Sequence, residues 1–115
     1  MTTTLSPEAF TMLRDSATKA CALLKVLANE DRLLLLCQLT QGERNVGELE
    51  SLCGIRQPTL SQQLAVLREE GMVNARRDGK YIYYSLANPE VIQVMSTLSS
   101  LYCGRVLTEL KSHPY

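Results

Sequence analysis

The sequence has 115 residues with 45% hydrophobic side chains, which is enough for one small globular domain with an ordinary core. No apolar run approaches the ~20 residues that a membrane helix needs, and no secretory signal pattern opens the chain, so we expect a cytoplasmic protein. Twelve basic and twelve acidic side chains give a net charge of zero, which at first argues against a nucleic-acid partner. Residues 54–86, however, carry five basic and three acidic side chains, so any phosphate contacts belong to this stretch.

The first part of the chain predicts two helices. Ser6 is a suitable N-cap and Pro7 a suitable first residue for a helix over 7–27. Its apolar residues keep helical spacing at Phe10, Leu13, Ala17, Ala20, Leu24 and Leu27. A second helix is expected through 32–40, with Asn29 as its cap and Gly42 at its close. Because this second helix is apolar nearly all round, we expect it to lie at the centre of the fold.

Two further helices follow in close succession. Asn45 and Glu48 form an N-cap and N3 pair that opens a helix over 46–53, and Gly54 ends it. In "RQPTLSQQLAVLREEG", Pro58 pre-sets the first turn of the next helix and Gly71 stops it. One face of that helix carries Leu60, Leu64 and Leu67. The tight connection between the two helices is typical of a helix-turn-helix, here spanning about 46–70.

The remaining sequence predicts a hairpin and a last helix. Asp78-Gly79 is expected as a two-residue turn between two strands over about 72–86. Asn88 and Pro89 open a helix over about 89–111, with Val91, Met95, Leu98 and Tyr102 on one stripe and Val106 and Leu110 on a neighbouring one. The fold class is therefore mainly α with a β-hairpin wing (α+β), a single winged helix-turn-helix domain over 1–115.

This order of elements predicts DNA binding, with the second helix of the pair in the major groove and the hairpin along the backbone. With the leucines inward, Gln62 lies near the centre of the outward face, Pro58 and Ala65 lie beside it, and Thr59 and Ser61 form its edges. Glutamine can address adenine bidentately. Salt-dependent contacts are expected from Arg56, Arg76, Arg77 and Lys80. The alternative is a solvated helix face beside a charged hairpin tip with no nucleic-acid role.

The first and last helices, over about 7–27 and 89–111, carry more apolar surface than this compact core can cover. We expect the excess to form the symmetric interface of a homodimer, which would place two recognition helices one turn of duplex apart. The alternative is that both helices pack only on their own subunit.

The run "LLKVLANEDRLLLLCQL" and the later "QPTLSQQLAVLREEG" with its wing resemble the ArsR/SmtB family of bacterial winged-helix repressors, over roughly residues 20–86. The resemblance implies a dimeric, cytoplasmic repressor that binds double-stranded operator DNA and is released by an inducer. Its DNA contacts map onto Gln57, Ser61 and Gln62, and its wing contacts map onto Arg76, Arg77 and Lys80.

Many family members sense metals through two cysteines in an "ELCVCDL" helix, where this sequence reads "ELESLCG" with Glu50 and Leu52. Others use ligands on the last helix, where this chain offers only His113. Zinc sites need three or four protein ligands. We therefore expect no metal and no cofactor, although a soft metal or metalloid inducer bound by scattered cysteines remains an alternative.

A narrower subgroup, the persulfide-responsive repressors such as BigR, SqrR, HlyU and YgaV, resembles this chain more closely. Cys37 in "LLLLCQL" and Cys103 in "SLYCGRV" match its two reactive cysteines, which implies a repressor released when persulfide or polysulfide cross-links them. Taken alone, Cys37 reads as a small buried hydrophobe, and we assign that role to Cys21 and Cys53. A general sensor of thiol oxidation is a further alternative.

The expected chemistry is attack of a thiolate on a persulfide sulfur, followed by resolution through the second thiol. No cation adjoins Cys37 to lower the pKa of its thiol, so we expect attack to begin at Cys103, beside Gly104 and Arg105. The sequence has no Cys-x-x-Cys, no Cys with a neighbouring His and no phosphate-binding glycine loop, so we expect no enzyme. A protein-interaction module that has lost DNA binding is the remaining alternative.

Overall fold

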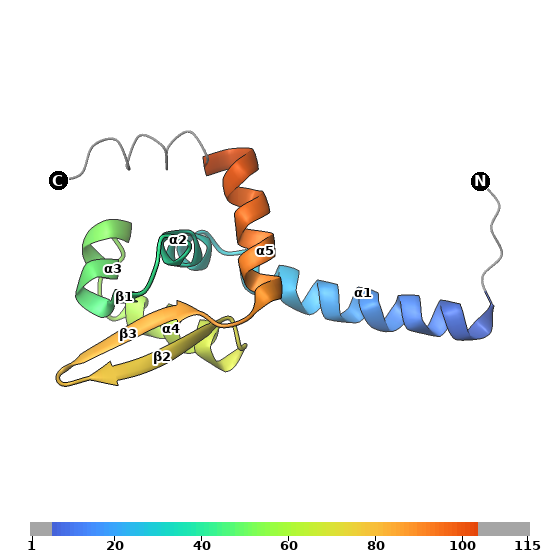
Figure 1. Ribbon diagram of the computed structural model, residues 1–115, viewed down its shortest axis with the longest axis horizontal. Coiled ribbons are helices and arrows are strands. Elements are labelled where there is room, and N and C mark those ends of the chain that lie inside the picture. Colours follow the sequence, from blue (N-terminus) through green and yellow to red (C-terminus); the bar gives the residue numbers. More distant parts are fainter. Residues whose placement is uncertain (1–5, 104–115) are drawn as a thin grey trace.

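The computed structural model describes residues 6–103, which form a helical body, a three-stranded sheet and one helix that leaves the body (Figure 1). In chain order the elements are α1 (Pro7–Leu27), α2 (Glu30–Leu39), β1 (Arg44–Asn45), α3 (Val46–Cys53), α4 (Thr59–Glu69), β2 (Val73–Asp78), β3 (Tyr81–Leu86), α5 (Pro89–Leu98) and the π-helical turn η1 (Ser99–Cys103). The winged helix-turn-helix that the sequence predicts is therefore present. No helix among the described residues is both long and apolar enough to cross a bilayer.

Side-chain caps begin the helices where the sequence predicts them. Ser6 accepts a hydrogen bond from the N–H of Ala9, and Asn29 accepts one from Arg32 at 3.1 Å. Asn45 and Glu48 form a full capping box, with N–H to side-chain distances of 2.8 and 2.9 Å. Each cap satisfies a backbone donor that has no partner within its own helix. The second helix begins at Glu30, two residues before the expected start, because Asn29 caps it there.

The core is built from leucines of three helices. Leu35 and Leu36 of α2, Leu49 of α3, and Leu60, Leu64 and Leu67 of α4 are all essentially inaccessible to solvent. Val91 and Met95 of α5 complete the buried cluster. The predicted central place of α2 is confirmed, since α1, α3, α4 and β3 all contact it.

The sheet has the antiparallel order β1-β3-β2. Its two-residue strand β1, which no pattern in the sequence predicts, pairs Arg44 and Asn45 with Tyr84 and Tyr83. The predicted Asp78-Gly79 turn was wrong by one residue. Asp78 pairs with Tyr81 as the last rung, so the turn consists of Gly79 and Lys80, with Gly79 at a φ of 64°. Glycine adopts this left-handed conformation without steric cost, which explains the shift.

The last helix differs from its prediction in the described part. Regular α-helix ends at Leu98, and the chain continues to Cys103 in a wider π-helical turn. The rest of the expected helix, with Val106 and Leu110, lies outside the described residues. Val91 and Met95 are buried as expected, whereas Tyr102 of the same predicted stripe is 79% exposed. The widened turn changes the angular position of the residues that follow, so the stripe does not continue through it.

Helix α1 extends from the body and contacts it only near its C-terminal end, where Val26 and Leu27 are buried (Figure 1). Phe10, Met12, Leu13 and Leu24 are 56–69% exposed. The predicted excess of apolar surface on the first helix is therefore confirmed within this single chain.

Candidate nucleic-acid interface and thiol site

The predicted recognition helix, α4, presents the expected face to solvent. Its leucines point into the core, while Thr59, Ser61, Gln62 and Ala65 are exposed. The helix begins at Thr59, with Pro58 in the N-cap position and no capping side chain there. The exposed face is small and rich in hydrogen-bonding groups, as expected of a helix that enters the major groove.

Gln57 organises the start of α4. Its Oε1 accepts hydrogen bonds from the backbone N–H of Ser61 at 3.0 Å and from the Ser61 hydroxyl at 2.7 Å. The amide nitrogen of Gln57 donates to no other described residue, so both its hydrogens are available to an acceptor outside the protein. These two hydrogen bonds hold Gln57 and Ser61, both predicted contact residues, in a fixed arrangement at the N-terminus of α4. This is the end of a helix that attracts phosphate.

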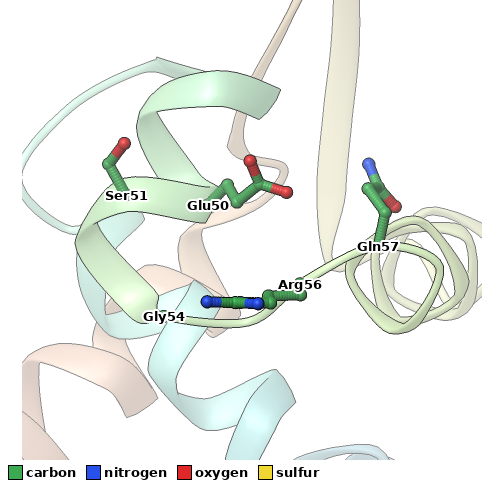
Figure 2. A pocket seen from close by; sticks show the side chains of 5 residues that line it. All are labelled: Glu50, Ser51, Gly54, Arg56 and Gln57. Atoms are coloured by element: carbon green, nitrogen blue, oxygen red, sulfur yellow. The ribbon is translucent and has the colours of Figure 1, made fainter.

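A shallow pocket of about 600 Å³ lies at the turn between α3 and α4, lined by Glu50, Ser51, Gly54, Arg56 and Gln57 (Figure 2). Figure 2 shows Arg56 extended along the turn toward Gly54, and Glu50 directed across the pocket from α3. An anion inside the pocket would meet this carboxylate as well as the guanidinium. Arg56 is exposed, so it is placed to contact a phosphate at the rim of the pocket.

The three predicted cations of the wing differ in their surroundings. Arg76 forms a bidentate ion pair with Glu43 in the loop between α2 and β1, with N···O distances of 2.6 and 3.1 Å. The pair lowers the pKa of the Glu43 carboxyl through its hydrogen bonds and charge. Arg77 donates to the carbonyl of Gly79 at 3.3 Å, and Lys80 lies 5.4 Å from the centre of the Tyr81 ring. Within residues 6–103, Arg77 and Lys80 therefore carry positive charge on the wing without a carboxylate partner.

Cys37 lies against the last helical segment of the described chain. Its Sγ is 3.8 Å from the hydroxyl oxygen of Ser99, a buried residue at the start of η1. Cys103 ends the same turn four residues later, but its side chain lies outside the described part of the structure. The predicted pairing of the two sulfurs is therefore neither confirmed nor contradicted.

The other two described cysteines differ from each other. Cys53 is half-buried beside α2, where its thiol donates to the Leu34 carbonyl at 3.8 Å. Burial, and next the negative charge that Cys37 and Asp31 can carry, raise the pKa of the Cys53 thiol to about 11. Cys21 is exposed on α1, so its predicted place in the core was wrong for the isolated chain. The error arises because the apolar side of α1 faces away from the body.

Residues 6–103 contain no group of three or more His, Cys, Asp or Glu side chains placed to hold a metal ion. His113, the candidate metal ligand that the sequence offers in its last helix, lies outside the described residues.

The profile of "Bacterial regulatory protein, arsR family" matches residues 29–75. The biofilm growth-associated repressor of Agrobacterium fabrum is 52% identical over 88 residues, which is 76% of this chain and 75% of that protein. The chain belongs to the arsR family. Its architecture is the winged helix-turn-helix of DNA-binding transcriptional regulators, and its relatives are named as regulators of this kind.

Solved structures agree with this family assignment. Reduced HlyU from Vibrio cholerae superposes with a TM-score of 0.77 at 42% identity, covering 80% of this chain and 97% of that one. The homodimeric winged helix-turn-helix DNA-binding domain of Mb0332 from Mycobacterium bovis has a TM-score of 0.65 at 29% identity and covers 99% of this chain and 98% of that one. The resemblance to the regulators that include HlyU is therefore confirmed; HlyU of V. cholerae is itself named a transcriptional activator.

Proposed function

We propose that this arsR-family protein is a homodimeric repressor that leaves its operator when reactive sulfur species cross-link Cys37 and Cys103. The observation that carries the proposal is the 3.8 Å approach between Cys37 Sγ and Ser99 Oγ. It joins a helix of the DNA-binding body to the turn that contains the second cysteine. The repressing direction follows the A. fabrum relative, which is named as a repressor.

The DNA-binding part of the proposal rests on α4 and the wing. The hydrogen-bonding face of α4 reads base edges, and the cations at the turn and wing contact phosphates. The contacts proposed for this role are Arg56, Gln57, Thr59, Ser61, Gln62, Arg77 and Lys80. Arg76, the remaining residue of the predicted set, is considered separately below because Glu43 already binds it. Glu69 and Glu70 lie at the far end of α4, so only its N-terminal half approaches the negatively charged duplex.

The dimer rests on apolar surface that this chain leaves uncovered. Besides the exposed residues of α1, Ile92 of α5 is 47% and Leu101 of η1 is 67% exposed. Large apolar patches on a soluble domain mark interaction surfaces. A second copy of the chain is the proposed partner, because the Mb0332 domain from M. bovis is homodimeric and a dimer supplies the second recognition helix that a two-fold operator requires.

The thiol part of the proposal follows from where Cys37 lies. Ser99 and Cys103 are four residues apart, about one helical turn, so a sulfur that contacts the first is near the backbone of the second. A direct disulfide needs Cα atoms ~5.5 Å apart, and a bridge with additional sulfur atoms spans a wider gap. When the bridge contains additional sulfur, this difference in reach gives a physical basis for a response to persulfide that peroxide does not reproduce.

The chemistry balances with the persulfide as the oxidant. A thiolate attacks the outer sulfur of RSSH, which gives a cysteine persulfide and the thiol RSH. The second cysteine then attacks the inner sulfur of that persulfide, which forms the disulfide and releases H₂S. Alternatively, the other cysteine attacks the inner sulfur of a second RSSH, which gives a mixed disulfide and H₂S. The cysteine persulfide then attacks the cysteine sulfur of that mixed disulfide, which forms a trisulfide and releases RSH. Either bridge ties α2 to η1, next to the proposed dimer surface. Reducing operator occupancy from 99% to 1% requires ~5.5 kcal/mol of preference for the released state.

The decisive experiment combines gel-shift assays with intact-mass spectrometry on the wild-type protein and on Cys37→Ser, Cys103→Ser and Cys53→Ser. Persulfide treatment is expected to produce a Cys37–Cys103 bridge and to release DNA from the wild type and from Cys53→Ser, the matched control. Neither of the other variants should respond. A bridge that leaves operator affinity unchanged would refute the switch, as would release of DNA from Cys37→Ser.

The same assay separates the alternatives. Equal release by peroxide and by persulfide would identify a general thiol-oxidation sensor. Stoichiometric binding of a soft metal or metalloid to the reduced protein, with loss of DNA binding, would identify a metal-responsive regulator. A reporter under the operator checks the direction, since higher expression without the protein is expected of a repressor.

A further inference from the structure

Arg76 of β2 uses both its charge and its flat face in contacts within the protein. Its Nη2 lies 2.6 Å from Glu43 Oε1 and its Nε lies 3.1 Å from Glu43 Oε2. The Cζ atom sits 4.9 Å from the centre of the Tyr83 ring, and Nη1 is 3.8 Å from a carboxylate oxygen of Asp78. Arginine binds a carboxylate most strongly when two of its N–H groups donate in parallel and its flat face stacks on an aromatic ring. Because the guanidinium is planar, little side-chain entropy is lost for each hydrogen bond formed. A phosphate would have to displace a partner that is already in place.

This ion pair crosses the sheet. Arg76 is on β2, Tyr83 is opposite it on β3, and Glu43 immediately precedes β1 on the far edge. Strand β1 pairs only as far as Tyr83, so beyond that rung the wing consists of two strands alone. An isolated two-stranded hairpin is marginally stable in water. The Glu43–Arg76 pair therefore holds the wing at the point where it loses the support of the third strand.

Arg76 and its neighbour Arg77 face opposite sides of the sheet, because side chains alternate along a strand. Arg77 is opposite Ile82, on the side that carries Tyr84. Ile82 and Tyr84 line a groove of about 620 Å³ together with Ser61 and other residues of α4. Arg77 thus lies on the side of the wing that faces the recognition helix, and Arg76 lies on the other side, with Tyr83.

We infer that Arg76 is a positioning residue, which with Glu43 sets the angle of the wing relative to α4, while Arg77 and Lys80 make the phosphate contacts. The inference rests on the proposed DNA-binding function and changes the role of one residue that the sequence assigned to DNA. The hydrogen bonds from Arg76 hold the pKa of the Glu43 carboxyl below its ordinary value, the direction expected when a guanidinium stabilises a carboxylate.

Operator titrations of Glu43→Ala test this role, because the two readings predict opposite signs. Removal of a carboxylate near the DNA strengthens binding on electrostatic grounds alone, and it also frees Arg76 if that residue contacts phosphate. If the pair positions the wing, Glu43→Ala weakens binding by about three- to five-fold, the range of a well-formed exposed pair. Glu69→Ala is the control, since that acid has no ion pair within the described chain and its loss should leave affinity unchanged or higher. Tighter binding by Glu43→Ala would overturn the inference.

The salt dependence and a charge swap provide two further arms. Arg77→Gln is expected to reduce the slope of log K against log salt by about 0.9, the loss of one phosphate contact, and Glu43→Ala is expected to leave it unchanged. The double variant Glu43→Arg/Arg76→Glu keeps the net charge and the pair, and should bind within about two-fold of wild type. If the double variant binds operator DNA no more tightly than Arg76→Glu alone, the positive charge at position 76 itself contacts the DNA.

Hydrogen exchange of the free protein separates failure of this inference from failure of the proposed function. Amide exchange at Asp78 and Tyr81, the last paired rung of the wing, should accelerate in Glu43→Ala and return toward wild type in the charge swap. Unchanged exchange would remove the positioning role. If the wild-type protein does not bind DNA but the exchange result is as expected, the DNA-binding proposal is refuted. The role of the Glu43–Arg76 pair in holding the wing would still stand.

Discussion

The body of the molecule and helix α1 differ in how far their apolar side chains are buried. In the body, leucines from α2, α3 and α4 are removed from solvent by other parts of the same chain. In α1, an equally apolar helix, only the last two residues are buried and Phe10, Leu13 and Leu24 stand in solvent. The contrast teaches that the core of the helix-turn-helix is closed within residues 6–103, whereas the same residues leave the apolar stripe of α1 uncovered, as expected of an interaction surface.

The largest expected effect distinguishes a core leucine from one on α1. Leu64→Ala removes a side chain that is 1% exposed and should lower the free energy of unfolding by about 3–5 kcal/mol, because the site cannot collapse around the cavity. Leu13→Ala makes the same chemical change at a residue that is 58% exposed. Its cost should be small at low protein concentration and should grow with concentration, because the loss is one of association. Urea unfolding at two concentrations measures both, and equal, concentration-independent costs would contradict the distinction.

The second prediction concerns the stripe of α1 as a dimer surface. Leu13→Glu/Leu24→Glu should yield a monomer that keeps its helical content and binds operator DNA about 100-fold or more weakly, since two linked half-site contacts become one. Met12→Glu is the matched control, because Met12 is as exposed but lies about 100° around the helix from Leu13 and therefore off the stripe. Sedimentation and operator titration provide the readouts. A dimer that survives the double change would place the interface elsewhere.

Much of the body was predictable because local signals and the helical period agree there. The spacing of Leu60, Leu64 and Leu67 indicated the inward face of α4, and Asn45 with Glu48 indicated the start of α3; both are as expected. The hairpin turn was missed by one residue, since Asp-Gly is a frequent turn pair and only the strand register selects Gly79-Lys80. The two-residue strand β1 is too short for any periodicity to show.

The site was predictable in its list of residues but not in their partners. Exposure of Thr59, Ser61 and Gln62 followed from the position of the leucines. That Arg76 binds Glu43 did not, because the two are 33 residues apart and meet only when β1 takes the outer edge of the sheet. The π-helical turn before Cys103 was missed as well, because "SSLYC" continues an apolar helical pattern without a glycine or proline.

A third prediction tests the joint between the body and α1. Arg32 donates to the carbonyls of Val26 and Lys25 at the end of α1, and its Nη1 donates to Gln63 of α4 at 3.1 Å. These bonds satisfy carbonyls that a helix end leaves without partners. Arg32→Gln should lower the free energy of unfolding by about 2 kcal/mol, the cost of losing charge-assisted bonds at a half-buried position. Arg14→Gln, on the exposed part of α1, should change it by less than about 0.5 kcal/mol. Denaturant unfolding measures both, and similar small changes would show that the joint is held by packing alone.

The smallest effect is a difference in thiol reactivity between the two regions. Because burial raises the pKa of Cys53 to about 11, only about one in a thousand of these thiols is ionised at pH 8, and alkylation there should be slow. The folded pKa lies above that of the unfolded chain, so the neutral thiol favours folding below the ordinary thiol pKa. This contribution is lost as pH rises toward 11.

Cys21 instead reports on the α1 surface, since it is exposed in the single chain and shares the stripe of Phe10 and Leu24. If α1 forms the proposed dimer, alkylation of Cys21, followed peptide by peptide with mass spectrometry, should be slow in the wild-type protein and fast in Leu13→Glu/Leu24→Glu, with Cys53 slow in both. If Cys21 reacts equally fast in the two proteins, α1 is solvated in both of them. The apolar face of α1 would then need a partner other than a second copy of this chain.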